Sequence, residues 1–147
     1  MKKLDPGIPT VALTANQPSW NSEGDEGDYQ WVYRKEPSPW MAGLDIKKFK
    51  GSIVKAAHAI SVDVLSPFHT EVTREMIAEA HSLGMRVVPY TVNDTERMKE
   101  LIRMRVDGII TDRPATLRAI CRELGVKIPD PATDPSKKPY YTGVDGL

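Results

Sequence analysis

Side chains that could take part in proton transfer or ligand binding follow the predicted strands of this chain. His69 comes soon after the dipeptide Ser66-Pro67, and a histidine there could act as a general acid or base if its pKa lay near neutrality. A single loop histidine is more often an ordinary residue. Tyr90 offers an apolar ring with a hydroxyl, which suits either the wall of a binding pocket or the core. Asn93 could contact a ligand or could cap the helix that follows it.

Acidic and basic residues close the last predicted strand. Asp112 could approach a metal ion, or could form a cap or turn hydrogen bond ahead of Pro114. Arg113 could contact a phosphate beside a helix N-terminus, where backbone N–H groups favour anions, or could be a solvated surface charge. Asp63 and Asp107 also lie on predicted strands, but the carboxylates lack the compact spacing of metal ligands. The sequence therefore predicts no metal site within this chain.

The other histidines and the single cysteine are predicted to be structural. His58 and His81 fall on predicted helices and are expected at their surface. Cys121 lies on an apolar helical stripe, which predicts a buried position. One cysteine also excludes an internal disulfide framework and a cysteine-based zinc cluster.

Alternating strands and helices must position these residues. Short apolar strands are predicted at residues 10–14, 62–65, 86–92 and 107–111. The predicted helices cover residues 52–60, a segment capped by Thr70 and ended by Gly84, a segment capped by Asn93, and a segment from Pro114 to Gly125. Strands separated by helices predict a parallel sheet with right-handed crossovers. Four such units fit a small open sheet or half of a (β/α)8 barrel, and in both folds the chemistry belongs at the carboxyl ends of the strands.

Two sequence blocks make this pattern more specific. Residues 84–94 read GMRVVPYTVND and residues 106–114 read VDGIITDRP. Together they resemble the last two strand units of the glycerophosphodiester phosphodiesterase family, whose domain is a TIM barrel. The family usually has tryptophan where Tyr90 stands and commonly glycine where Arg105 stands. On this resemblance the fold class is α/β, with four βα units that correspond to strands 5–8, the C-terminal half of a TIM (β/α)8 barrel.

The resemblance also implies an activity. The family hydrolyses glycerophosphodiesters to glycerol 3-phosphate and an alcohol, using two catalytic histidines and one divalent cation, for which Ca²⁺ or Mg²⁺ would suit carboxylate ligands. Its His-Arg-Gly and Glu-Asn-Thr motifs do not occur in this sequence, so the chain alone is expected to be inactive. His69 is a weak candidate for a catalytic residue. Tyr90, Asn93 and Trp40 are the candidates for substrate binding.

The regions beside the strand–helix units are less regular. Residues 15–45 contain all three tryptophans, Trp40 among them, and are predicted to form an aromatic insertion loop. This loop either covers the active face or forms a separate cluster. Residues 126–147 contain four prolines and are predicted to form an extended tail. The half-barrel domain is therefore expected to span residues 1–125.

Composition narrows the function classes further. The 147 residues contain 20 Lys and Arg against 20 Asp and Glu, a formal net charge of zero, which argues against nucleic-acid binding. No apolar run approaches the roughly 18 residues of a membrane span. No secretory signal follows the first methionine. A cytoplasmic location is the default expectation, with the N-terminus of the parent protein taken to be missing.

Three functions fit these observations. The first is a fragment of a glycerophosphodiester phosphodiesterase, whose partner would be the missing N-terminal half. The second is a non-catalytic half-barrel interaction or scaffolding module, whose open edges and apolar inner face would favour a homo-oligomer. The third is a small open-sheet phosphate-binding domain, which the lack of a Gly-rich phosphate loop disfavours.

Overall fold

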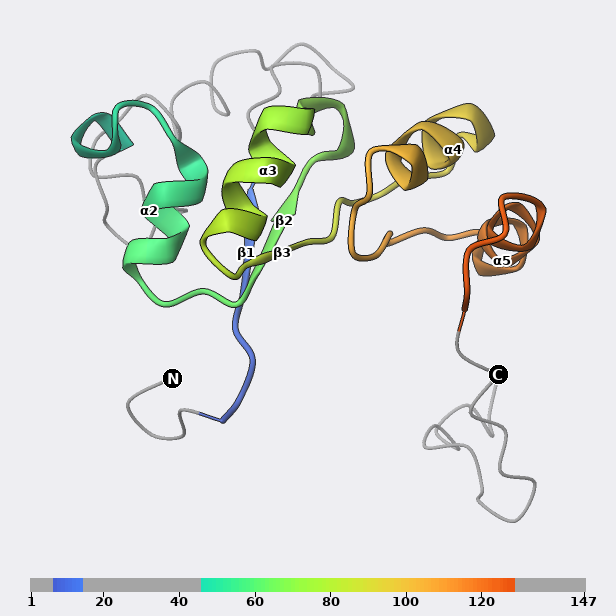
Figure 1. The fold of residues 1–147 in the computed structure, drawn as a ribbon, viewed down its shortest axis with the longest axis horizontal. Helices are drawn as coiled ribbons and strands as arrows, with labels where there is room; N and C mark the ends of the chain where they lie inside the picture. The colour runs from blue at the N-terminus through green and yellow to red at the C-terminus, as the bar shows by residue number, and fades with distance from the viewer. Residues whose placement is uncertain (1–6, 15–45, 129–147) are drawn as a thin grey trace, which may run out of the picture.

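The fold is an α/β arrangement of parallel strands and helices, seen in a computed structural model that describes residues 7–14 and 46–128 (Figure 1). Within these ranges the elements follow in the order β1 (Val11–Thr14), η3 (Ile46–Phe49), α2 (Ile53–Ala59), β2 (Val64–Pro67), η4 (His69–Glu71), α3 (Arg74–Ser82), β3 (Arg86–Val87), α4 (Thr95–Arg103) and α5 (Pro114–Glu123). Figure 1 shows α2 to α5 in chain order from the teal to the red end of the ribbon.

The sheet is parallel, with strand order β1-β2-β3. The predicted strand 86–92 is regular only at Arg86–Val87. Beyond it the chain still follows β2, because the Val88 N–H donates to the Leu65 carbonyl at 2.9 Å. Pro67 on β2 has no N–H to donate to the Val88 carbonyl, which accepts the Ser66 hydroxyl at 2.6 Å instead, and this interrupts the ladder until the isolated bridge further along the strand.

The predicted strand 107–111 is wrong as a regular strand. This segment nevertheless runs beside the continuation of β3. The Asp107 N–H donates to the Val87 carbonyl and the Ile110 N–H to the Pro89 carbonyl, each at 2.9 Å. Between these two bonds the 107–110 segment advances by three residues, whereas the strand from Val87 to Pro89 advances by two. The later segment therefore has one extra residue, which disturbs the ladder as in a β-bulge.

Two of the predicted helix caps are also wrong. Thr73, not Thr70, caps α3, and its hydroxyl accepts the backbone N–H three residues on at 3.1 Å. Thr70 lies in η4. Asp94, not Asn93, caps α4, and its carboxylate accepts the N–H three residues on at 2.7 Å. Both observed caps are of the preferred residue types.

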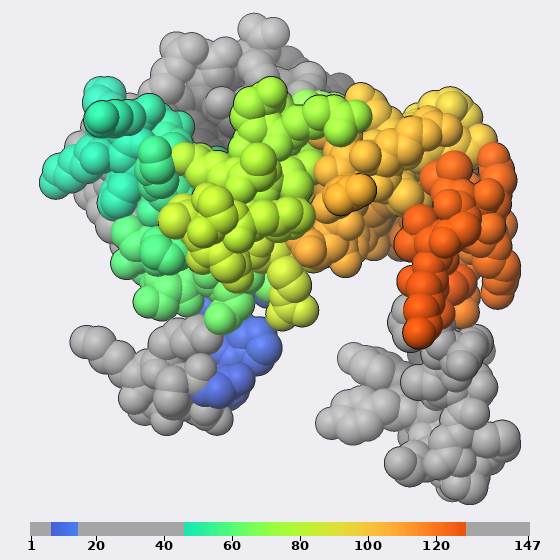
Figure 2. All heavy atoms as spheres, in the orientation of Figure 1, coloured from blue at the N-terminus to red at the C-terminus, as the bar shows by residue number. Residues whose placement is uncertain are grey.

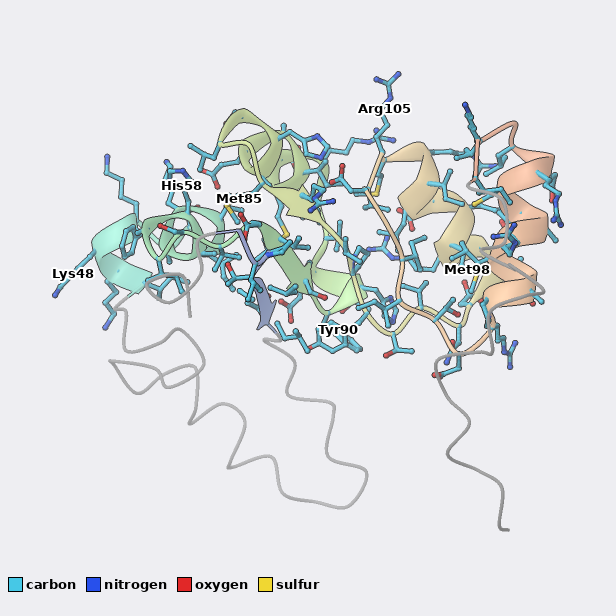
Figure 3. The ribbon with its side chains drawn as sticks, turned by 90° about the horizontal axis from the view of Figure 1, so that it is seen from below. Lys48, His58, Met85, Tyr90, Met98 and Arg105 are labelled. Atoms are coloured by element: carbon cyan, nitrogen blue, oxygen red, sulfur yellow. The ribbon has the colours of Figure 1, made fainter. Side chains whose placement is uncertain are left out.

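The helices cover one face of the sheet. The neighbouring sheet residues Leu65 and Val87 are fully buried beside the helix residues Met98 and Leu101. Met98, in α4, lies beside α5 (Figure 3). Cys121 is buried as predicted, with 8% of its surface exposed. Figure 2 shows the described side chains as a continuous band from α2 to α5.

Several apolar side chains remain exposed. Val11 is 52% exposed and Leu13 is 50% exposed, whereas their strand neighbour Ala12 packs against the core. This alternation places Val11 and Leu13 on the sheet face opposite the helices. Ile110 is 44% exposed.

Candidate functional site at the carboxyl ends of the strands

The carboxyl ends of the strands are tied together by hydrogen bonds. The Thr14 carbonyl, at the end of β1, accepts the Phe68 N–H at 2.8 Å and the Tyr90 hydroxyl at 3.2 Å. The Tyr90 carbonyl accepts the His69 N–H at 2.9 Å. These bonds bring three sequence-distant segments together at the sheet edge where parallel α/β folds bind ligands.

Tyr90 is half-buried at this edge (Figure 3). Its ring meets the Phe68 ring edge to face, with centroids 6.0 Å apart. Strand alternation predicts Val88, Tyr90 and Val92 on one face, but Val92 is completely buried in the core while the other two are half-buried. The alternation therefore breaks after Tyr90, where the N–H of Val92 turns to bond the Ile110 carbonyl at 2.9 Å.

Asn93 joins two loops at the same edge and does not cap α4. Its side-chain oxygen accepts the Thr111 hydroxyl at 3.1 Å and the Asp112 N–H at 3.0 Å. Its side-chain NH2 donates to the Asp112 carboxylate at 2.7 Å. Asp112 thus forms a loop hydrogen bond, one of its two predicted roles. Arg113 is exposed at the start of α5 and makes no side-chain cap there.

His69 is half-buried in the loop after β2. Its ring lies 4.7 Å from the Phe68 ring, centroid to centroid. Burial lowers the pKa of His69 below the ordinary 6.5, the positive charge of Arg97 lowers it further, and Asp94 opposes this. The imidazole is therefore neutral near pH 7, a form that can accept a proton. Among the described residues its buried Nδ1 has no hydrogen-bond partner.

The carboxylates predicted on strands lie at the opposite edge of the sheet. Asp63 accepts the Thr10 N–H at 2.6 Å and the Thr10 hydroxyl at 3.0 Å. Asp107 accepts the Val87 N–H at 2.7 Å and lies 2.9 Å from Nε2 of His81. Both carboxylates therefore hold neighbouring strands together at the amino ends.

The remaining predicted residues have simple outcomes. His58 is exposed on α2, as expected. His81 is also exposed, but it pairs with Asp107, a contact that its helical position does not suggest. Trp40 lies outside the described residues.

No divalent-cation site is formed by the described parts of the chain. Within residues 7–14 and 46–128, no group of three or more His, Cys, Asp or Glu side chains could hold a metal ion. Asp63 and Asp107 accept backbone amides, and Asp112 bonds Asn93. These residues do not fit a metal ion. In the same ranges no helix is long and apolar enough to cross a membrane.

Fold and site together define a parallel α/β domain with its polar loops gathered at the carboxyl edge of the sheet. Residues 5–116 match the model of the glycerophosphoryl diester phosphodiesterase family, and the chain belongs to that family. The family is generally metal-dependent.

Three individual proteins are similar to this chain to different degrees. A protein from Caldanaerobacter subterraneus subsp. tengcongensis, named glycerophosphodiester phosphodiesterase, is 38% identical over 61 residues, or 42% of this chain and 25% of the relative. A solved structure from Silicibacter pomeroyi DSS-3, provisionally named a glycerophosphoryl diester phosphodiesterase, superposes with a TM-score of 0.63 at 26% identity. The superposition covers 87% of this chain and 35% of the Silicibacter protein. The solved glycerophosphodiester phosphodiesterase from Parabacteroides distasonis ATCC 8503 has a TM-score of 0.48 at 19% identity, covering 84% of this chain and 61% of its own.

The described fold is thus similar to TIM-barrel proteins of this family. The chain spans only 25% to 35% of the lengths of the Caldanaerobacter and Silicibacter proteins.

Proposed function

We propose that this chain supplies the substrate-binding wall of a glycerophosphodiester phosphodiesterase, as strands 5–8 of its barrel. In this proposal residues 1–125 form the half-barrel, residues 15–45 an aromatic loop that brings Trp40 to the substrate, and residues 126–147 a tail. The intact enzyme would release glycerol 3-phosphate and an alcohol from glycerophosphodiesters.

The observation that carries the proposal is the convergence of Thr14, Phe68, His69 and Tyr90 at one sheet edge. A tyrosine ring can pack against glycerol carbons while its hydroxyl forms hydrogen bonds. The Tyr90 hydroxyl donates to the Thr14 carbonyl, and a phenolic oxygen is in general an acceptor as well as a donor. Asn93 supports this wall by fixing the neighbouring loop on Asp112.

Phosphodiester hydrolysis also needs charge stabilisation on the phosphoryl oxygens and protonation of the departing alkoxide. A bound Ca²⁺ or Mg²⁺ would supply the positive charge. The family's His-Arg-Gly and Glu-Asn-Thr motifs do not occur in the sequence, so we assign the metal ligands and the acid/base pair to a segment outside this chain. In this proposal His69, neutral and half-buried, is a proton acceptor that this edge adds.

An assay of the purified chain tests whether the metal ligands and the acid/base pair lie outside it. We expect no turnover of glycerophosphocholine with Ca²⁺ or with Mg²⁺. Metal-dependent turnover at an ordinary enzyme rate, about 1–10³ s⁻¹, would contradict the proposal.

A binding measurement tests the wall itself. Calorimetry with glycerol 3-phosphate should give weak, saturable binding to the full chain. Tyr90→Ala should weaken it about tenfold, the loss of a ring contact and a hydrogen bond, whereas Tyr90→Phe should lose less. Equal affinity for the wild-type and Tyr90→Ala proteins would remove Tyr90 from the site.

A second candidate function is a non-catalytic half-barrel interaction module. The observation that favours it is the exposure of three apolar side chains at the two lateral sides of the sheet. Val11 and Leu13 lie on the outer strand β1, and Ile110 lies beside β3. Exposed apolar strand residues promote association. Sedimentation should then show self-association at roughly tens of micromolar. A compact, monodisperse monomer at that concentration would dismiss this candidate.

A further inference from the structure

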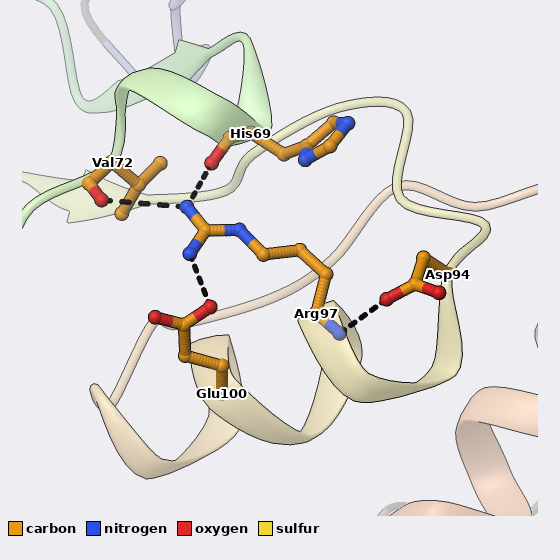
Figure 4. A network of polar contacts seen from close by, with 5 residues as sticks. All are labelled: His69, Val72, Asp94, Arg97 and Glu100. Carbon is orange, nitrogen blue, oxygen red and sulfur yellow. Dashed lines mark hydrogen bonds and ion pairs between the residues drawn. The ribbon is translucent and has the colours of Figure 1, made fainter.

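Arg97, on the first turn of α4, reaches across to the loop that follows β2 (Figure 4). Its Nη2 donates to the His69 carbonyl and to the Val72 carbonyl, the latter at 3.4 Å. Its Nη1 donates to the Glu100 carboxylate at 2.6 Å. The guanidinium thus joins two backbone carbonyls that lie more than twenty residues away in sequence.

Burial indicates which of these contacts matters. The Arg97 side chain is 17% exposed, whereas Glu100 is 57% exposed. An exposed carboxylate within the same helix contributes little to stability. A buried guanidinium, by contrast, is costly unless its donors are bonded, and among the described residues the buried Nε of Arg97 has no partner. The position of the guanidinium is therefore explained by the two loop carbonyls rather than by Glu100.

The loop that Arg97 holds carries the side chains of the candidate site. The carbonyls it bonds lie at the start of η4 (His69–Glu71) and just after its end. The N–H of His69 bonds the Tyr90 carbonyl, and its ring lies against Phe68. A shift of this turn would move the His69 and Phe68 side chains relative to Tyr90.

We propose that Arg97 is a positioning residue that fixes the turn from His69 to Val72 and, through it, the Phe68 and His69 side chains at the carboxyl edge of the sheet. The value of this placement for a substrate rests on the proposed function. The positioning itself is a property of the chain alone and can be measured without a ligand.

The positive charge of Arg97 provides a second measurement that tests the proposal, the pKa of His69. Burial is the largest cause that lowers the pKa of His69, followed by the positive charge of Arg97, and Asp94 acts in the opposite direction. Both of these charged groups lie on or next to α4, while Tyr90 faces His69 from the neighbouring strand. Removing the Arg97 charge should therefore raise the pKa of His69, and keeping the charge on a different side chain should change it less.

The experiment compares three variants of the full chain by amide hydrogen exchange and NMR titration of His69. In Arg97→Gln, exchange of the His69 amide should rise about tenfold or more, because a charged hydrogen bond to the turn is lost. The Val88 amide, bonded to Leu65, should keep its rate, and the His69 pKa should rise. In Arg97→Lys, exchange should also rise, because one ammonium cannot match the planar fork of a guanidinium, while the His69 pKa should stay nearer the wild-type value.

Glu100→Gln is the matched control, because it removes the ion pair and leaves the loop carbonyls bonded to Arg97. The exchange rate of the His69 amide should stay within about twofold of wild type, and the His69 pKa should stay near its wild-type value, as expected for an exposed pair. Wild-type exchange of the His69 amide in Arg97→Gln would overturn the proposal. If Arg97→Gln does not fold, the Arg97→Lys variant provides the test. Exchange of the His69 amide at the wild-type rate in that variant would also overturn the proposal. Turnover by the chain alone would defeat the proposed function and leave these results unaffected.

Discussion

The two edges of the sheet use polar residues in different ways. At the amino edge, the carboxylates of Asp63 and Asp107 accept the backbone amides of Thr10 and Val87. At the carboxyl edge, two buried polar atoms, Thr14 Oγ1 and His69 Nδ1, have no partner among the described residues. Buried polar atoms are normally bonded, so one edge is built for stability and the other retains unused bonding capacity. This division agrees with the general placement of sites in parallel α/β folds.

The largest expected effect is at the amino edge. Asp107→Ala should lower the free energy of unfolding by about 2–3 kcal/mol, because the N–H of the fully buried Val87 loses a charged acceptor. Urea unfolding measures this. His81→Ala is the control, and should cost less than about 1 kcal/mol because both members of its pair with Asp107 are partly exposed. Equal effects of the two substitutions would show that the ion pair, rather than the strand amide, is the important contact.

A smaller effect is expected where the two carboxyl-edge loops meet. Asn93→Ala removes the hydrogen bonds to Thr111 and Asp112 and should cost about 1–2 kcal/mol in urea unfolding. In a double-mutant cycle, Asn93→Ala and Asp112→Ala should show a clear coupling energy. Additive effects would mean that the two side chains do not act together.

The pH dependence of stability should reveal His69. Its folded-state pKa lies below the unfolded value, so folding favours the neutral form. The stability it contributes is complete above pH 6.5 and is lost as the pH falls through the folded pKa. The stability advantage of the wild type over His69→Gln should therefore shrink when urea unfolding is repeated from pH 7.5 down to about pH 5. A constant difference over this range would contradict the shifted pKa.

The smallest effect is expected just after α4, at a residue that precedes Asp107 by two positions. Arg105 has φ 69° and points away from the rest of the structure (Figure 3). Only glycine adopts this left-handed conformation without cost, so Arg105→Gly should raise the free energy of unfolding by about 1 kcal/mol. Arg105→Ala keeps the Cβ and should give little change. A loss of stability in the glycine variant would indicate that the arginine side chain makes a compensating contact.

The elements set by local pattern were predictable from the sequence. The helix predicted at residues 52–60 is confirmed as α2, and the buried position of Cys121 is confirmed. The match of residues 5–116 to the family model confirms the resemblance that was based on residues 84–94 and 106–114.

The remaining features depend on contacts between distant residues. Asn93 and Asp94 are both good cap residues, and only the bonds from Asn93 to the later loop assign the cap to Asp94. The spacing of Arg97 and Glu100 suggests an ordinary helix-surface pair. Nothing in the sequence places Arg97 against the His69 carbonyl, because that contact requires the loop and α4 to be packed together.

An NMR titration of the full chain with glycerol 3-phosphate shows which edge of the sheet binds a ligand. We expect saturable shifts at Phe68, His69 and Tyr90, with no change at Asp63, Asp107 or His81, because only the carboxyl edge faces a ligand. Shifts centred on the amino edge, or none at either edge up to roughly tens of millimolar, well beyond the weak affinity of a partial site, would contradict this expectation.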